Sequence, residues 1–145
     1  MKQLTLTILL LTLYACAPIL EQPISSDDPP SSQGNNYLPG PEDPNFLREP
    51  AFVESSEVLI LESYPLQFTL AIKGDLPTPC HKLRIVANPP DPEKRIMVKV
   101  YSLVDLKTTC IAVLEPFEVN YPLGSFPAGS YSVWVNGEKV AEIQS

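Results

Sequence analysis

A strict alternation of apolar and polar residues is the feature of this sequence that most limits its fold. The stretch LQFTLAIK, at positions 66–73, places every second side chain on an apolar face of an extended chain. A period of two is typical of a β-strand that is buried on one side. Residues 51–145 show no comparable helical period, so the sequence predicts an all-β domain there. The apolar members of the stretch are Leu66, Phe68, Leu70 and Ile72.

Short apolar segments recur about every ten residues, and turns rich in proline and glycine separate them. In one segment we expect Leu83 and Ile85 to face the core and Arg84 to face solvent. Pro122 has no N–H to donate to a neighbouring strand, so it marks a sheet edge or the end of a strand. Six or seven such strands predict an antiparallel β-sandwich over residues 51–145. The other segments are residues 56–62, 81–87, 95–103, 117–123 and 130–143.

The last segment carries the clearest local signal. Asn136-Gly137 accepts positive φ at both central positions of a type I′ turn and therefore predicts a β-hairpin. The stretch FPAGSYSVWVNG, residues 126–137, also resembles the closing hairpin of immunoglobulin-like and fibronectin-III-like modules in bacterial surface proteins. That resemblance implies that Tyr131 caps a corner of the fold. Val133 stands where antibody-type domains have a cysteine, so the resemblance is one of shape.

The N-terminus has the composition of a secretion signal. A single basic residue, Lys2, precedes an apolar run from Leu4 to Leu13. About ten residues rise roughly 15 Å as a helix, which is half the thickness of a bilayer core. We therefore expect a cleaved leader rather than a transmembrane anchor. The alternative is an N-terminal core element.

The tetrapeptide Leu13-Tyr14-Ala15-Cys16 resembles the lipobox of bacterial lipoproteins. The resemblance implies a signal peptide at residues 1–15, diacylglycerol on the Cys16 thiol, and acylation, for example with palmitate, of the new amino terminus. Tyr14 departs from the family pattern, in which a small or β-branched residue is usual. Membrane lipid is then the partner that acylated Cys16 binds. The expected location is the cell envelope: outer membrane, periplasm or outer cell surface.

Residues 16–50 have the composition of a tether. Positions 17–50 contain eight prolines, and their apolar residues occur singly without a regular period. Such a segment buries too little surface to offset its conformational entropy, so we expect a disordered linker behind the lipid anchor. The alternative is that its prolines bind a partner or the cell wall.

Two cysteines remain once Cys16 is assigned to the anchor. An even remainder in an exported chain indicates a disulfide, here between Cys80 and Cys110. The alternative is a pair of separate buried thiols.

The sequence offers no catalytic or metal-binding set. His81 is the single histidine, whereas zinc needs three or four ligands, and its position beside Cys80 indicates a surface loop. Glu115 and Glu118 are close in a chain with 17 acidic residues, which is expected by chance. We therefore predict no enzyme, no metal and no cofactor. Residues 51–145 hold eleven acids and eight bases without a basic stripe, which argues against nucleic acid as a partner.

One aromatic residue suggests recognition. By parity, Trp134 faces away from the core that Tyr131 and Val133 enter. An exposed tryptophan can dominate contact energetics, and with Met97 and Tyr101 it forms a candidate binding patch. The alternative is that Trp134 packs beneath a covering segment.

These features together predict a lipid-anchored envelope protein whose β-sandwich is a non-enzymatic binding or structural module. Two other functions stay open. One is a protease inhibitor presented on the envelope, because the stretches DLPTPCH and NPPDPEK are rigid. The other is an accessory subunit of an envelope complex.

Overall fold

The computed structural model describes residues 36–145. The predicted signal peptide, Cys16 and the predicted linker up to residue 35 lie outside the described residues. Within residues 36–145, no helix has the length and apolar character needed to cross a membrane.

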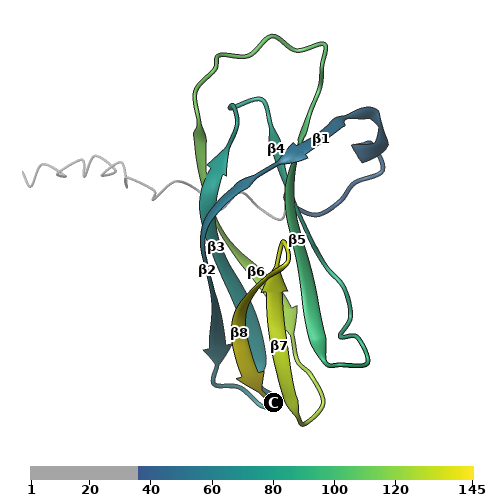
Figure 1. The fold of residues 1–145 in the computed structure, drawn as a ribbon, viewed down its shortest axis with the longest axis vertical. Helices are drawn as coiled ribbons and strands as arrows, with labels where there is room; N and C mark the ends of the chain where they lie inside the picture. The colour runs from purple at the N-terminus through teal and green to yellow at the C-terminus, as the bar shows by residue number, and fades with distance from the viewer. Residues whose placement is uncertain (1–35) are drawn as a thin grey trace, which may run out of the picture. The chain divides into compact units, whose positions relative to one another are not determined.

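The described chain folds into two β-sheets that form a sandwich, which confirms the predicted fold class (Figure 1). One sheet has the order β2-β3-β6. The other has β5 at its centre, with β4 along one side and β1 and β7 along the other, and β8 pairs with β7. The elements are a 3₁₀ helix η1 (Asp43–Asn45) and the strands β1 (Leu47–Pro50), β2 (Phe52–Leu61), β3 (Gln67–Leu76), β4 (Lys82–Ala87), β5 (Arg95–Val104), β6 (Glu115–Gly124), β7 (Ser130–Val135) and β8 (Glu138–Gln144).

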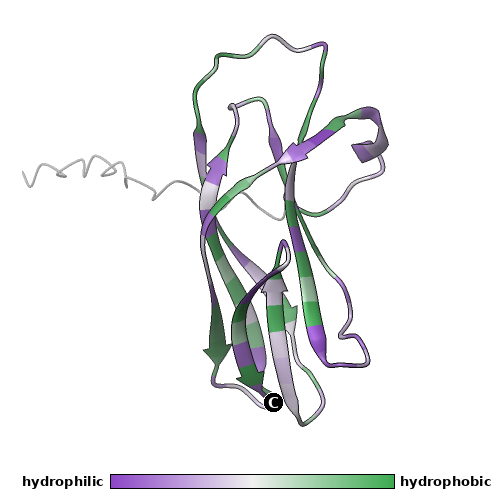
Figure 2. Ribbon diagram, in the orientation of Figure 1, coloured by the Kyte–Doolittle hydropathy of each residue, from purple (hydrophilic) through white to green (hydrophobic). Residues whose placement is uncertain are grey.

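The predicted alternation places the core as expected. Phe68, Leu70 and Ile72 of β3 are at most 1% exposed, and alternate residues of β5 face them from the second sheet. Apolar and polar bands alternate along these strands in Figure 2. Leu66 differs from the prediction: it precedes β3 and is 37% exposed. The buried residues of β5 are Ile96, Val98 and Val100.

One strand pairing departs from the predicted antiparallel sandwich. β5 and β7 run parallel, with Met97 opposite Trp134, while every other pairing among the described strands is antiparallel. Immunoglobulin-type sandwiches consist of antiparallel sheets. The parallel pair therefore distinguishes this sandwich from the immunoglobulin-like arrangement that the hairpin resemblance implied. Pairing between β5 and β7 is not a local property, so no feature of the hairpin alone could reveal it.

The local signals of the C-terminal third are confirmed. Asn136 and Gly137 have φ values of 49° and 92°, and they join β7 to β8 as a hairpin. The buried Tyr131 donates its hydroxyl hydrogen bond to the carbonyl of Pro127 at 2.9 Å, which is the contact expected of a tyrosine corner. Pro122 lies on β6, an edge strand of its sheet.

The domain begins before residue 51, so the predicted linker boundary is wrong. Tyr37 is 7% exposed and its ring lies 5.7 Å from that of Tyr121, while β1 pairs with β5. A segment with many prolines lacks the periodicity that signals a strand. The segment is nevertheless part of the domain, because a few of its residues contact residues of β4, β5 and β6.

Arg84 shows how this segment is held. The sequence predicts that Arg84 faces solvent, but its side chain is 9% exposed. Its guanidinium donates hydrogen bonds to both carboxylate oxygens of Asp43 at 2.9 Å and to the carbonyl of Asn36 at 2.8 Å. The Arg84 side chain points away from the core, as the alternation of side chains along β4 predicts. The segment that contains Asp43 covers the Arg84 side chain. The two residues are 41 positions apart, so the alternation along one strand cannot predict this contact.

Candidate functional site

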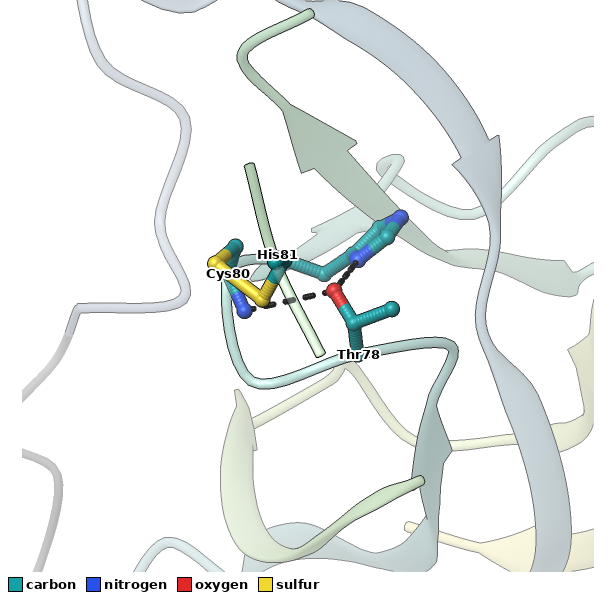
Figure 3. Close-up of a disulfide and its surroundings, with 4 residues drawn as sticks. Thr78, Cys80 and His81 are labelled. Carbon is teal, nitrogen blue, oxygen red and sulfur yellow. Dashed lines mark hydrogen bonds between the residues drawn. A yellow bond between two sulfur atoms is a disulfide. The ribbon is translucent and has the colours of Figure 1, made fainter. Parts of the chain in front are cut away.

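A disulfide braces one end of the sandwich. Cys80 in the β3–β4 turn is bonded to Cys110 in the β5–β6 connection, and the two Cα atoms are 6.1 Å apart (Figure 3). The predicted pairing is thus confirmed. It ties together two connections that are 30 residues apart in the chain.

His81 is buried beside this disulfide. Its Nδ1 lies 2.8 Å from the hydroxyl of Thr78, and its Nε2 lies 2.9 Å from a carboxylate oxygen of Glu49. The side chain is 5% exposed, so the prediction of a surface position is wrong. The reason is that Glu49 belongs to β1, which sequence analysis assigned to the linker.

The group of Thr78, His81 and Glu49 places a hydroxyl, an imidazole and a carboxylate in a row, as a Ser-His-Asp triad does. The Thr78 hydroxyl oxygen also accepts the backbone N–H of Cys80 at 3.3 Å, a contact within its own turn (Figure 3). Both ring nitrogens of the buried His81 therefore lie within hydrogen-bonding distance of protein groups, the Thr78 hydroxyl and the Glu49 carboxylate. This geometry fastens the β3–β4 turn to β1.

The β5–β6 connection is the most exposed apolar part of this end. We name residues 105–114 the apolar loop. Within it, Leu106 is 77% and Ile111 is 70% exposed, and Val113 and Leu114 are about half exposed. Large apolar side chains on an exposed loop make residues 105–114 a candidate interaction site. Sequence reasoning missed this site, although one signal was present: residues 110–114 are apolar yet fall between two predicted strands.

The N-terminal segment enters the domain at the same end. Asn36, the first described residue, lines a depression of about 300 Å³ together with residues of the β3–β4 turn and the start of β6. Pro79 and His81 flank the disulfide cysteine, and Glu115 directly follows the apolar loop. Asn36 therefore lies near the β3–β4 turn that carries Cys80. The remaining lining residues are Leu76, Lys82 and Leu83.

The structure brings two of the three predicted patch residues together. Met97 and Trp134 are half-buried register partners on β5 and β7, on the face away from the core. The indole N–H of Trp134 donates to the Ser132 hydroxyl at 3.0 Å. Tyr101 lies four residues further along β5, and the guanidinium carbon of Arg48 sits 3.6 Å from its ring centroid. The three side chains thus share a sheet face without forming one open surface.

The acidic residues considered for chemistry separate. Glu115 and Glu118 are three apart on β6, so their side chains point to opposite faces. Glu118 forms an exposed ion pair with Lys73 at 2.9 Å. In the described part of the chain, no three side chains of His, Cys, Asp or Glu gather as a metal site.

A second depression lies on the opposite edge of the sandwich. It measures about 510 Å³ and runs between β2 and the β7–β8 hairpin. The pairing of β2 with β3 has a register shift between Val53 and Ser55 at this point. Its lining is mixed in charge, with Glu54, Glu138 and Lys139.

Comparison with known proteins gives one family. The family model of the ORF11 β-sandwich domain matches residues 70–144, just over half of the chain and most of β3 to β8. No curated protein and no solved structure matches the chain.

Proposed function

The chain belongs to the ORF11 β-sandwich domain family, and we propose that it is a lipid-anchored envelope protein whose sandwich is a non-enzymatic binding module. The observation that carries the binding role is the apolar loop. Its exposed side chains sit on a connection that the Cys80–Cys110 disulfide holds in place. A braced loop loses less conformational entropy on binding than a free one.

The lipid anchor is supported by the sequence. The lipobox-like Leu13-Tyr14-Ala15-Cys16 supplies the acylation site, and the disulfide fits an oxidising compartment. Two or more acyl chains hold a protein stably on a membrane, where one chain is marginal. Mass spectrometry of protein from native membranes tests the anchor. We expect a mature chain that begins at acylated Cys16. An unmodified chain that retains Met1 contradicts the proposal.

We also propose that the Thr78, His81 and Glu49 group is structural rather than catalytic. The Thr78 hydroxyl is already bonded within its turn, and His81 is buried against β1. The test is ester and peptide hydrolysis by the purified protein and by Thr78→Ala. We expect neither protein to show turnover. Turnover that Thr78→Ala abolishes would assign a hydrolase instead.

A protease inhibitor is the second candidate function. The observation that favours it is an exposed apolar side chain, Ile111, directly after a disulfide-bonded cysteine. An inhibitor presents such a rigid loop to an enzyme. Titration against a panel of secreted serine and cysteine proteases separates the two functions. Inhibition that Ile111→Asp abolishes supports this candidate, and no inhibition at micromolar concentration removes it.

A further inference from the structure

We propose that the apolar loop contacts a lipid bilayer, so that the domain touches the same membrane that carries its anchor. This inference rests on the proposed lipid anchor and names the ligand of the binding module. The contact would hold the braced end of the sandwich against the membrane surface. The opposite end, with the β2–β3 connection, would face away.

The first argument is the chemistry of the loop. Leu106 and Ile111 are mostly exposed, and Val113 and Leu114 are about half exposed. The charged residues of the apolar loop are Asp105 and Lys107, so the loop is neutral overall in a chain with a net charge of −7. Apolar side chains enter the boundary between headgroups and acyl chains, and a lysine there is attracted to anionic lipid. The loop therefore fits a lipid surface better than the rest of this acidic protein does.

The shape of the loop supports this contact. Asp105 accepts the backbone N–H of Lys107 at 2.9 Å, and its carbonyl accepts the N–H of Thr108 at 3.0 Å. The first of these bonds uses a carboxylate oxygen of Asp105 inside the turn. The disulfide holds the following half of the loop, so Ile111 and Val113 project from a constrained backbone.

The second argument is the place where the chain joins the domain. Asn36 lines the same depression as Pro79 and His81, next to the disulfide. Asn36 lies twenty positions after Cys16 in the sequence. A flexible coil of that length spans about 25 Å. An anchor at Cys16 would therefore tether the domain near the bilayer through Asn36, which lines the depression next to the disulfide.

The other end of the sandwich is the natural comparison. Ile60, Leu61 and Tyr64 are also exposed there, around the β2–β3 connection. Glu57 and Glu62 accompany them, and no basic residue lies between positions 52 and 66. Acidic side chains are repelled by anionic headgroups, and the β2–β3 connection lies at the opposite end of the sandwich from the β5–β6 connection (Figure 1). It supplies a matched control for the apolar loop.

Depth-dependent fluorescence quenching tests the inference. The full chain, carrying Trp134→Phe to remove its single natural tryptophan, receives Val113→Trp in the apolar loop or Ile60→Trp at the opposite end. Each mature protein is reconstituted into vesicles of phosphatidylglycerol and brominated phosphatidylcholine. We expect the tryptophan at position 113 to lose at least half of its emission relative to unbrominated vesicles. We expect less than a tenth to be lost at position 60.

The outcomes separate the anchor from the loop contact. Protein that floats with the vesicles but shows no excess quenching at position 113 overturns the loop contact and leaves the anchor intact. Quenching at position 113 in protein whose mass shows no acyl chain supports the loop contact and overturns the anchor. A blue shift at position 113 that depends on protein concentration and not on vesicles assigns the loop to a protein interface, which overturns the lipid contact.

Discussion

The side-chain amide of Asn136 forms hydrogen bonds with both backbone groups of Val100. Its Oδ1 accepts the Val100 N–H at 2.8 Å, and its Nδ2 donates to the Val100 carbonyl at 2.9 Å. Its own N–H donates to the carbonyl of Val98 at 2.9 Å. Asn136 therefore turns the β7–β8 hairpin and also extends the parallel pairing of β7 with β5 beyond the last residue of the strand.

This double role makes Asn136 sensitive to substitution. Asn136→Gly keeps positive φ accessible but removes two hydrogen bonds, so we expect a loss of about 1–3 kcal/mol in the free energy of unfolding. Asn136→Ala should lose about 1 kcal/mol more, because a non-glycine residue without a local hydrogen bond is strained at positive φ. Urea denaturation measures both. Equal stability of wild type and Asn136→Gly would contradict the assigned role.

The ion pair between Arg84 and Asp43 should make the stability of the domain depend on pH. Hydrogen bonds from the Arg84 guanidinium lower the pKa of the Asp43 carboxyl below its ordinary value. The stabilisation is therefore complete above the ordinary aspartate pKa of about 3.9. It is lost as the pH falls through the lower pKa of the folded state.

Asp43→Asn tests this dependence. We expect a loss of about 2–3 kcal/mol at pH 7, because a largely buried guanidinium keeps only a neutral partner. We also expect a flatter decline of stability below pH 4 than in the wild type. Glu142→Gln is the control, since the pKa of Glu142 is likewise lowered by Lys139 but the side chain is 68% exposed. A steep acid decline in Asp43→Asn equal to that of the wild type would count against the ion pair.

The disulfide should be a main source of stability at the braced end. Replacing both cysteines, by Cys80→Ser with Cys110→Ser, opens a loop whose ends are 30 residues apart. The expected cost is about 3–4 kcal/mol, from the larger entropy of the unfolded chain. Thermal unfolding of the double variant, beside the wild type with and without reductant, measures it. A reductant effect that persists in the double variant would show that another thiol is responsible.

Tyr131→Phe examines the corner contact alone. The substitution removes the hydroxyl that donates to Pro127 and keeps the buried ring, which packs 5.2 Å from the ring of Phe126. We expect a loss of about 1 kcal/mol. Tyr64→Phe is the control, because the Tyr64 side chain is fully exposed. Equal urea midpoints for the two variants would show that the corner hydrogen bond does not stabilise the domain.

The candidate site divides into a part that sequence could predict and a part that it could not. The Cys80–Cys110 pair followed from counting cysteines, because only one intramolecular pairing remained. The apolar loop did not follow, since exposure of Ile111 depends on whether another element covers it. The contact of His81 with Glu49 could not be predicted from the sequence either, because Glu49 is 32 residues away and lies in a segment without strand periodicity.

The sequence by itself determined the class of fold, the core-facing residues and the final hairpin. Those properties arise from neighbours along the chain: alternation sets the two faces of β3 and β5, and Asn136-Gly137 permits one tight turn. The tertiary structure alone decided that β7 runs parallel to β5 and that Arg84 is buried beneath Asp43. It also decided that Asn36 lies near the β3–β4 turn. These contacts join residues far apart in the chain, and their geometry depends on how whole sheets pack, which no local pattern encodes.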